Sequence, residues 1–174
     1  MAQEHLSFKG IPINGTLKQY TAEMMKAGFK NEGTTKEGIN VLSGDFAGFK
    51  GCYVCVMTIK NCDVVNRISV LFPEKETWSA LIDDYEFLKE LLTEKYGLPT
   101  EEIEEFTRPV YSDNSKIHAI SNGEIEWYSV FRTDLGDIEL TLIQGSIGYK
   151  ARVRLTYWDA QNTSTVRQNA LDDL

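Results

Sequence analysis

Lys26-Ala27-Gly28-Phe29 has a near copy later in the chain, Lys95-Tyr96-Gly97-Leu98. In both places an apolar stripe with helical spacing ends in a glycine and then an apolar residue, which is typical of a helix C-cap. After each cap the sequence changes to short alternating segments separated by turn residues, the pattern of antiparallel strands. The two stretches therefore predict one layout used twice, a helix followed by an antiparallel meander.

The first half begins with an extended arm over residues 5–13. A helix is then predicted from Thr16, a suitable N-cap, to Ala27, and its apolar stripe includes Tyr20 and Met24. Gly28 is expected in the left-handed position after the last helical turn. Three strands are predicted to follow, over residues 38–46, 49–60 and 64–72.

The middle one of these strands is apolar on both faces. Val54 and Val56 alternate with Tyr53, Cys55 and Met57, so each face carries side chains that favour burial. We therefore expect the strand to be covered on both sides, one side by the first helix. Closure of the other side within the chain is favoured over closure by a partner subunit.

The second half contains the longest apolar stripe with helical spacing. The predicted helix runs from Thr77, a suitable N-cap, to Gly97, and Pro99 prevents its continuation. Acidic residues 100–114 are predicted to be mostly loop, with a short helix at their start. Strands are then predicted over residues 116–122, 125–133, 137–144 and 149–158.

These elements predict an α+β fold with helices packed on antiparallel sheets. We expect residues 1–174 to form a single compact domain of two pseudo-repeats, about 5–73 and 74–160. A polar C-terminal tail, 161–174, is predicted either to form a brief helix or to fray. Chance recurrence of a common α+β layout is the alternative to a true duplication.

Composition and charge limit the classes of partner. The chain has 174 residues, 42% of them hydrophobic and 25% charged, which is ordinary for a globular protein with a sizeable core. Its formal net charge of -8 argues against a nucleic-acid partner, because neutralising phosphates requires lysine and arginine. Binding to a membrane surface is disfavoured for the same reason, and a solvated acidic surface is expected.

The sequence also bears on localisation. Met1-Ala2-Gln3-Glu4-His5 has no basic region leading into an apolar run, so it does not have the form of a secretory signal. No window approaches the roughly 18 apolar residues that a membrane span needs. We therefore expect a cytoplasmic protein.

The cysteines are candidate metal or redox residues. Cys52-x-x-Cys55 has a spacing that zinc and redox sites use, and Cys62 lies nearby. On a strand, however, residues three apart point to opposite faces, so the two thiols diverge. No second pair and no clustered histidine completes a four-ligand shell. We predict small buried side chains, no metal site and no cofactor.

Other residue types with catalytic potential are dispersed. His5 lies in the N-terminal arm and His118 in a predicted strand, each without a recognisable nucleophile. The glycine-rich segment 44–51 lacks the Lys-Ser/Thr ending and the following helix of a phosphate-binding loop, so it predicts a hairpin turn. Asp83 and Asp84 are adjacent on a helix and point in different directions. No catalytic residue is therefore assigned.

The polar face of the last predicted strand has binding character. Arg152, Arg154 and Trp158 share that face, and arginine and tryptophan are residues that anchor interfaces. Glu139 and Thr141 from the neighbouring strand are expected to flank them. The alternative is a cross-strand ladder of charges, which solvated sheet faces commonly carry.

Four segments carry a resemblance to a known family: Phe8-Lys9-Gly10-Ile11-Pro12-Ile13-Asn14-Gly15-Thr16-Leu17, Leu42-Ser43-Gly44-Asp45-Phe46-Ala47-Gly48, Val70-Leu71-Phe72-Pro73 and Ala170-Leu171-Asp172-Asp173-Leu174. Together they resemble a family of small uncharacterised proteins from gut Bacteroidetes over nearly the whole chain. The resemblance implies structural motifs, with no activity or site residues. In layout alone, tandem helix-plus-meander units are similar to β-lactamase-inhibitor-protein-like folds, which act by binding other proteins.

These observations favour a non-enzymatic binding or protein-interaction module, because the residues assemble no complete catalytic constellation. The partner is expected to be a protein or a small ligand. A monomer is favoured, with a homodimer as the alternative. A small enzyme with a polar pocket between the two halves is the second hypothesis.

Overall fold

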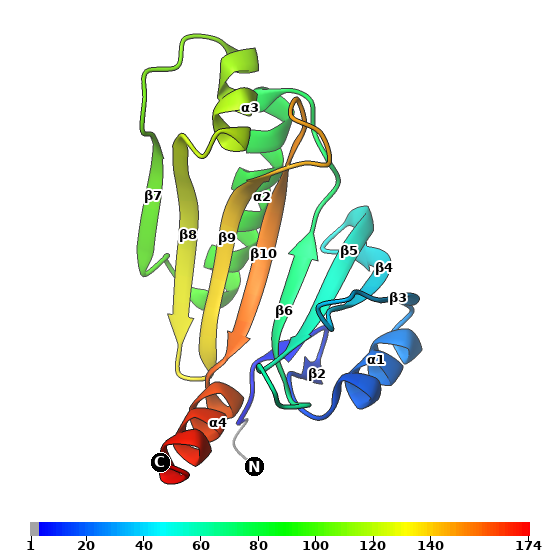
Figure 1. Cartoon of the computed structure of the whole chain (residues 1–174). Helices are drawn as coiled ribbons and strands as arrows, with labels where there is room; N and C mark the ends of the chain where they lie inside the picture. Colours follow the sequence, from blue (N-terminus) through cyan, green and yellow to red (C-terminus); the bar gives the residue numbers. More distant parts are fainter. Residues whose placement is uncertain (1–3) are drawn as a thin grey trace. The chain divides into compact units, whose positions relative to one another are not determined.

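A computed structural model of the protein describes residues 4–174 and has the expected α+β fold (Figure 1). Helices pack on an antiparallel sheet. Met1–Gln3, part of the N-terminal segment that was compared with a secretory signal, lie outside the described residues. The elements are β1 (Ser7–Phe8), β2 (Ile11–Pro12), α1 (Leu17–Lys26), β3 (Lys30–Thr34), β4 (Asn40–Phe46), β5 (Phe49–Thr58), β6 (Val65–Leu71), α2 (Trp78–Tyr96), β7 (Glu101–Phe106), α3 (Asp113–Ser121), β8 (Ile125–Thr133), β9 (Gly136–Gln144), β10 (Ala151–Asp159) and α4 (Ala160–Asp172).

The chain divides into two compact units. Unit 1 comprises the described residues up to Val70, together with Thr133–Asp137 and Thr156–Leu174. Unit 2 comprises Leu71–Arg132 and Ile138–Leu155. The two pseudo-repeats expected from the sequence stay a prediction.

The ends of α1 are set by local chemistry in the way the sequence predicts. The Thr16 hydroxyl accepts the Gln19 N–H at 3.2 Å, and the Gln19 side chain accepts the Thr16 N–H at 3.0 Å, which makes a capping box. At the other end Gly28 has φ +99°, and the Phe29 N–H donates to Met24 O at 3.1 Å. This pattern is a Schellman cap, and it ends the helix at the expected residue.

In unit 1 the strands are ordered β3-β4-β5-β6, followed by the C-terminal residues of β10. β4 and β5 run antiparallel with Asn40 opposite Val56. The Thr21 hydroxyl of α1 donates to Asn40 Oδ1 at 3.0 Å, so α1 lies on the face that carries Asn40 and Val56. β3, which was not predicted from the sequence, pairs with β4 at the edge of the sheet.

The expected burial of β5 on both faces holds only near the end of the strand, and at Tyr53 it is wrong. Cys52, Val54 and Val56 are fully buried on the α1 face. On the opposite face Tyr53 is 46% exposed and Cys55 is half-buried, and only Met57, near the end of the strand, is buried. The physical reason is that α1 covers one face only, and a tyrosine side chain tolerates solvent.

In unit 2 the strands are ordered from the N-terminal residues of β10 through β9 and β8 to β7. α2 begins at its expected N-cap Thr77, ends at Gly97 and covers one face of these strands. The Tyr85 hydroxyl of α2 lies 2.7 Å from the Ser129 hydroxyl of β8, and both side chains are buried. This contact places α2 on the face that carries the odd-numbered residues of β8.

Two elements of unit 2 differ from their predictions. Residues 101–106, expected as a short helix or loop, form β7, which pairs with β8 without a bulge from Glu101 opposite Val130 to Phe106 opposite Ile125. The segment 116–122, expected as a strand, lies instead in α3, which begins at the Ser112 N-cap and ends at the Asn122 C-cap. Ile117 and Ile120 are buried three residues apart, so helical spacing prevails over the apparent alternation. His118 therefore lies exposed on a helix.

The C-terminal tail forms α4, one of its two expected states. Asp159 is the N-cap of this helix and accepts the Asn162 N–H at 3.0 Å. Among the described residues, no helix is both long enough and apolar enough to cross a membrane.

Candidate functional site

Arg152, the first residue of the sequence-predicted surface, is held by an internal ion pair. Its guanidinium donates to Glu74, which also accepts a hydrogen bond from the Ser146 hydroxyl at 3.0 Å and one from the Ser146 N–H. Burial by itself raises the pKa of Glu74, but these hydrogen bonds and the arginine charge outweigh it and hold the pKa below its ordinary value. The contacts fasten the β9–β10 connection, so Arg152 has a structural partner.

Arg154 is paired less closely. Its Nη2 lies 3.8 Å from Glu139 Oε1, and its buried Nε has no hydrogen-bond partner among the described residues. Burial raises the pKa of Glu139, an effect that the Arg154 charge opposes and the Glu101 charge reinforces. Thr141, expected to flank the arginines, donates its hydroxyl to Trp127 O at 3.0 Å. In unit 2 this face therefore has the character of a cross-strand ladder.

Trp158 belongs to unit 1, whereas the two arginines belong to unit 2. Its side chain is half-buried, and its backbone carbonyl lies against Gly136. Gly136 has φ +146°, and a Cβ there would meet Trp158 O at 1.9 Å, so glycine is required at this position. The Trp158 carbonyl thus accounts for the glycine at the start of β9.

The outer edge of β7 offers unpaired backbone groups. The Thr107 N–H donates to Glu124 O at 3.0 Å, which shows that odd-numbered residues of this strand bond toward β8. Bonding direction alternates along a strand, so the N–H and C=O groups of Glu102, Glu104 and Phe106 point away from β8. β7 is the last strand in its sheet order, and Figure 1 shows no further strand beside it.

The edge strand of unit 1, β3, is built differently. Its register with β4 shifts between Asn31 and Gly33, and the Asn31 side chain accepts the Gly33 N–H at 3.0 Å. A bulge and a side chain bonded to the edge both hinder the addition of another strand. β7 has neither device over its six paired residues. Its protection is limited to the charge of its glutamates.

A hollow with a volume of about 590 Å³ lies between α2 and the start of β7. Glu86, Glu90 and Glu94 follow one another at four-residue spacing along α2 and form one wall. At the end of α2 the lining is apolar, because Leu98 lies there with 84% of its surface exposed. We call this hollow the acidic groove, and its lining residues are Glu86, Lys89, Glu90, Thr93, Glu94, Leu98, Pro99 and Glu102.

Lys89 is the single basic residue in the lining of the acidic groove, and its charge is already shared. It is 17% exposed, pairs with Glu104, and lies 3.2 Å from Glu86 and 3.5 Å from Glu102. Burial by itself lowers the pKa of Lys89, but these carboxylates outweigh it and hold the pKa above its ordinary value. Glu90 and Glu94 have no ion pair with any of the described residues, so the groove keeps a net negative charge.

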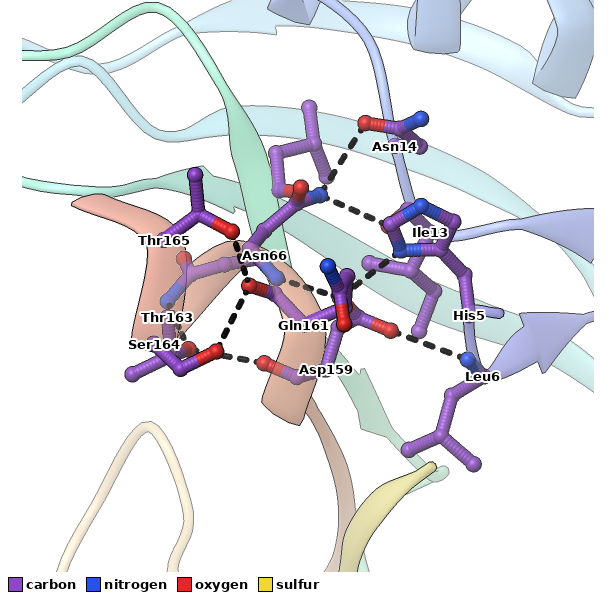
Figure 2. Close-up of polar contacts among 12 residues, drawn as sticks. His5, Leu6, Ile13, Asn14, Asn66, Asp159, Gln161, Thr163, Ser164 and Thr165 are labelled. Atoms are coloured by element: carbon purple, nitrogen blue, oxygen red, sulfur yellow. Dashed lines mark hydrogen bonds and ion pairs between the residues drawn. The ribbon is translucent and has the colours of Figure 1, made fainter. Parts of the chain in front are cut away.

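Asp159 forms a second polar cluster, in unit 1 (Figure 2). Its fully buried carboxylate accepts the Leu6 N–H at 2.9 Å and lies 2.9 Å from His5 Nδ1. The Asn162 side chain of the same helix turn donates to Ile13 O at 3.1 Å and to Val65 O at 3.0 Å. The cluster ties the N-terminal arm to the start of α4.

A histidine beside a buried carboxylate is also an element of catalytic triads, in which a neighbouring hydroxyl is the nucleophile. The Thr163 hydroxyl donates to Asp159 O at 2.7 Å, and the Ser164 hydroxyl donates to Gln161 O at 3.0 Å. Each is therefore engaged with the backbone of α4, and the cluster has the geometry of a clamp. His5 was recognisable from the sequence as a residue of the N-terminal arm, whereas Asp159 was not singled out. The local signal of Asp159 is its position just before a helix.

Comparison with protein-family models, with curated proteins and with solved structures finds no match for this chain. The two arginines of the β10 face already lie beside the internal carboxylates Glu74 and Glu139. The β7 edge, by contrast, leaves a row of backbone groups unpaired among the described residues, with the unpaired carboxylates of the acidic groove beside it.

Proposed function

We propose that this protein is a non-enzymatic interaction module that binds an extended peptide segment by strand addition to β7. The observation that carries the proposal is the row of outward-facing backbone groups at Glu102, Glu104 and Phe106. Main-chain hydrogen bonds to such an edge supply affinity for an extended segment, and pockets beside the edge supply specificity.

The alternative surface around Arg152 and Arg154 supports binding less well. Arg152 is already bound by Glu74, and Arg154 faces Glu139, so a partner would have to compete with internal pairs. A small enzyme with a polar pocket between the two halves stays a prediction. Within the described residues, the contact between His5 and Asp159 supports a structural clamp better than a catalytic site.

The proposal predicts a specific effect of proline in β7. Glu104→Pro removes an outward N–H and leaves the pairing with β8 in place, because that amide does not bond to β8. We expect it to weaken the binding of an extended peptide by about tenfold through the lost hydrogen bond and its neighbours. Glu104→Gln is the matched control, since it removes the same charge and keeps the N–H.

The measurement uses octapeptides in which threonine alternates with glutamine, valine or lysine. Fluorescence anisotropy gives their affinities, and hydrogen exchange by NMR reports on the amides of Glu102 and Glu104. We expect at least one peptide to slow exchange at these two amides. If none does so, or if Glu104→Pro binds as tightly as Glu104→Gln, the protein does not bind by strand addition at β7.

A further inference from the structure

Resting on the strand-addition function proposed above, we infer that the segment added to β7 is basic, with lysine or arginine at every second position. The acidic groove beside the strand determines the charge that the partner should carry. Side chains of an added strand alternate between the two faces of the sheet. Every second one therefore lies on the α2 face, where the groove opens.

The direction of the β7 side chains identifies this face. Glu104 contacts Lys89 of α2, and Phe106 packs on Trp78 of α2 with ring centroids 5.2 Å apart. Even-numbered residues of β7 thus point toward α2. A residue of the added strand that lies opposite Glu102 or Glu104 points the same way, because directly opposed residues in a sheet share a face.

The charges of the groove match a cation at that position. Glu90 and Glu94 have no ion pair with the described residues, and both are exposed one turn apart on α2. Lys89 satisfies Glu104 and part of the charge of Glu86 and Glu102. An arriving ammonium or guanidinium group therefore finds unpaired carboxylates, and its attraction grows as water is excluded from the groove.

The apolar lining at the end of α2 matches the rest of a long basic side chain. Leu98 is 84% exposed and lies beside Pro99 at the end of the groove. The methylene stems of lysine and arginine pack on such surface while their charged heads stay near water. An acidic or short polar side chain would leave Leu98 exposed and the carboxylates unpaired.

The same charges disfavour a second copy of this chain as the occupant. Antiparallel pairing of two β7 edges would bring Glu102 and Glu104 close to their counterparts in the other copy. Like charges placed opposite each other in a sheet are destabilising. A basic segment gains from the carboxylates that a second β7 would have to overcome.

The test compares three peptides of equal length with the full chain. One octapeptide alternates threonine with lysine, one alternates threonine with glutamine, and one carries the same four lysines as a block followed by four threonines. We expect the alternating lysine peptide to bind about tenfold more tightly than the glutamine peptide at low salt, with the preference falling as salt increases. The block peptide, with equal charge, should bind more weakly than the alternating one.

Matched variants locate the charge preference. Glu90→Gln with Glu94→Gln should remove most of it, whereas Glu105→Gln should keep it. Glu105 lies on the same strand but on the opposite face of the sheet from the groove, and it is exposed. None of these three glutamates is paired in the described structure, so we expect all the variants to fold, with urea midpoints close to that of the wild type.

The outcomes separate the two proposals. Equal binding of the lysine and glutamine peptides, both sensitive to Glu104→Pro, would overturn the basic specificity and keep strand addition. Lysine binding that is lost in the Glu90/Glu94 variant but unaffected by Glu104→Pro would overturn strand addition and leave a simple cation-binding groove. A preference that survives the Glu90/Glu94 variant, or equal binding of the block peptide, would overturn the inference about the groove.

Discussion

Glu74 and Glu139 lie in the same unit, but their surroundings shift their pKa values in opposite directions. Glu74 accepts hydrogen bonds from Ser146 and Arg152, which lower its pKa despite burial. Glu139 has its arginine, Arg154, only at 3.8 Å, and burial of its carboxylate raises its pKa. A partly buried carboxylate can therefore either stabilise the fold or weaken it, depending on how many donors reach it.

Replacing Glu139 should stabilise the protein at neutral pH. A pKa raised in the folded state means that folding favours the protonated form, so the wild type loses stability as pH rises through the folded pKa. Glu139→Gln stays neutral and avoids this loss. We expect a higher urea midpoint than wild type at about pH 7 and little difference at about pH 3, where both side chains are uncharged.

Urea titrations over this pH range, followed by far-UV circular dichroism, check the prediction. Glu126→Gln is the control, because Glu126 is an exposed glutamate on the neighbouring strand β8. A Glu139→Gln variant that is less stable than wild type at neutral pH would show that the pair with Arg154 outweighs the cost of burial.

Among the elements, β7 and α3 show how partners override local preference. Four of the six residues of β7 are glutamate, a poor strand former. They are held in a strand by six pairings with β8, and the charges of Lys89 and Arg132 offset Glu104 and Glu101. This composition also makes pairing of β7 with the β7 strand of a second copy unfavourable, because glutamates would lie opposite glutamates.

The strand β5 allows burial to be compared between its two faces at the neighbouring residues Val54 and Tyr53. Val54 is fully buried on the α1 face, so Val54→Asp places a charge in an apolar site and should cost about 3 kcal/mol or more. Tyr53 is 46% exposed, so Tyr53→Asp should cost about 1 kcal/mol or less. Urea midpoints of the two variants, one residue apart on the same strand, make the comparison direct. Equal destabilisation would mean that the Tyr53 face is also covered in solution.

For the molecule as a whole, the N-terminal arm and the start of α4 meet within unit 1. Asp159 joins the arm at Leu6, 153 residues away in sequence, to the first turn of α4. Contacts between such distant residues cost loop-closure entropy, which the rest of the fold has to offset. The clamp therefore reports on the completed fold of this unit.

Asp159→Ala should destabilise the protein strongly. It removes a helix N-cap and leaves the Leu6 N–H without its buried acceptor, and we expect a loss of about 3 kcal/mol in the free energy of unfolding. Asp159→Asn keeps one acceptor oxygen and should lose less. Asp173→Asn, at the exposed C-cap of the same helix, is the control and should unfold like wild type. If Asp159→Ala has the urea midpoint of the control, the clamp does not hold the arm in solution.

Features whose partners lie within a few residues were predictable from the amino-acid sequence. The caps at Thr16, Gly28, Thr77 and Gly97 were predictable, because a cap is a contact within one helical turn. The α+β class and most strands followed from hydrophobic periodicity, which reflects the nearest covering layer. The polar alternation of β10 likewise indicated a face with arginines.

Features whose partners lie far along the chain became visible only in the folded structure. β7 is a strand because β8 pairs with it, from Phe106 with Ile125 to Glu101 with Val130. Arg152 is occupied by Glu74 from 78 residues away, and Asp159 gains its role from the N-terminal arm. The acidic groove exists because α2 and β7 lie side by side. Such contacts depend on the topology of the fold, which the local propensities of the residues do not predict.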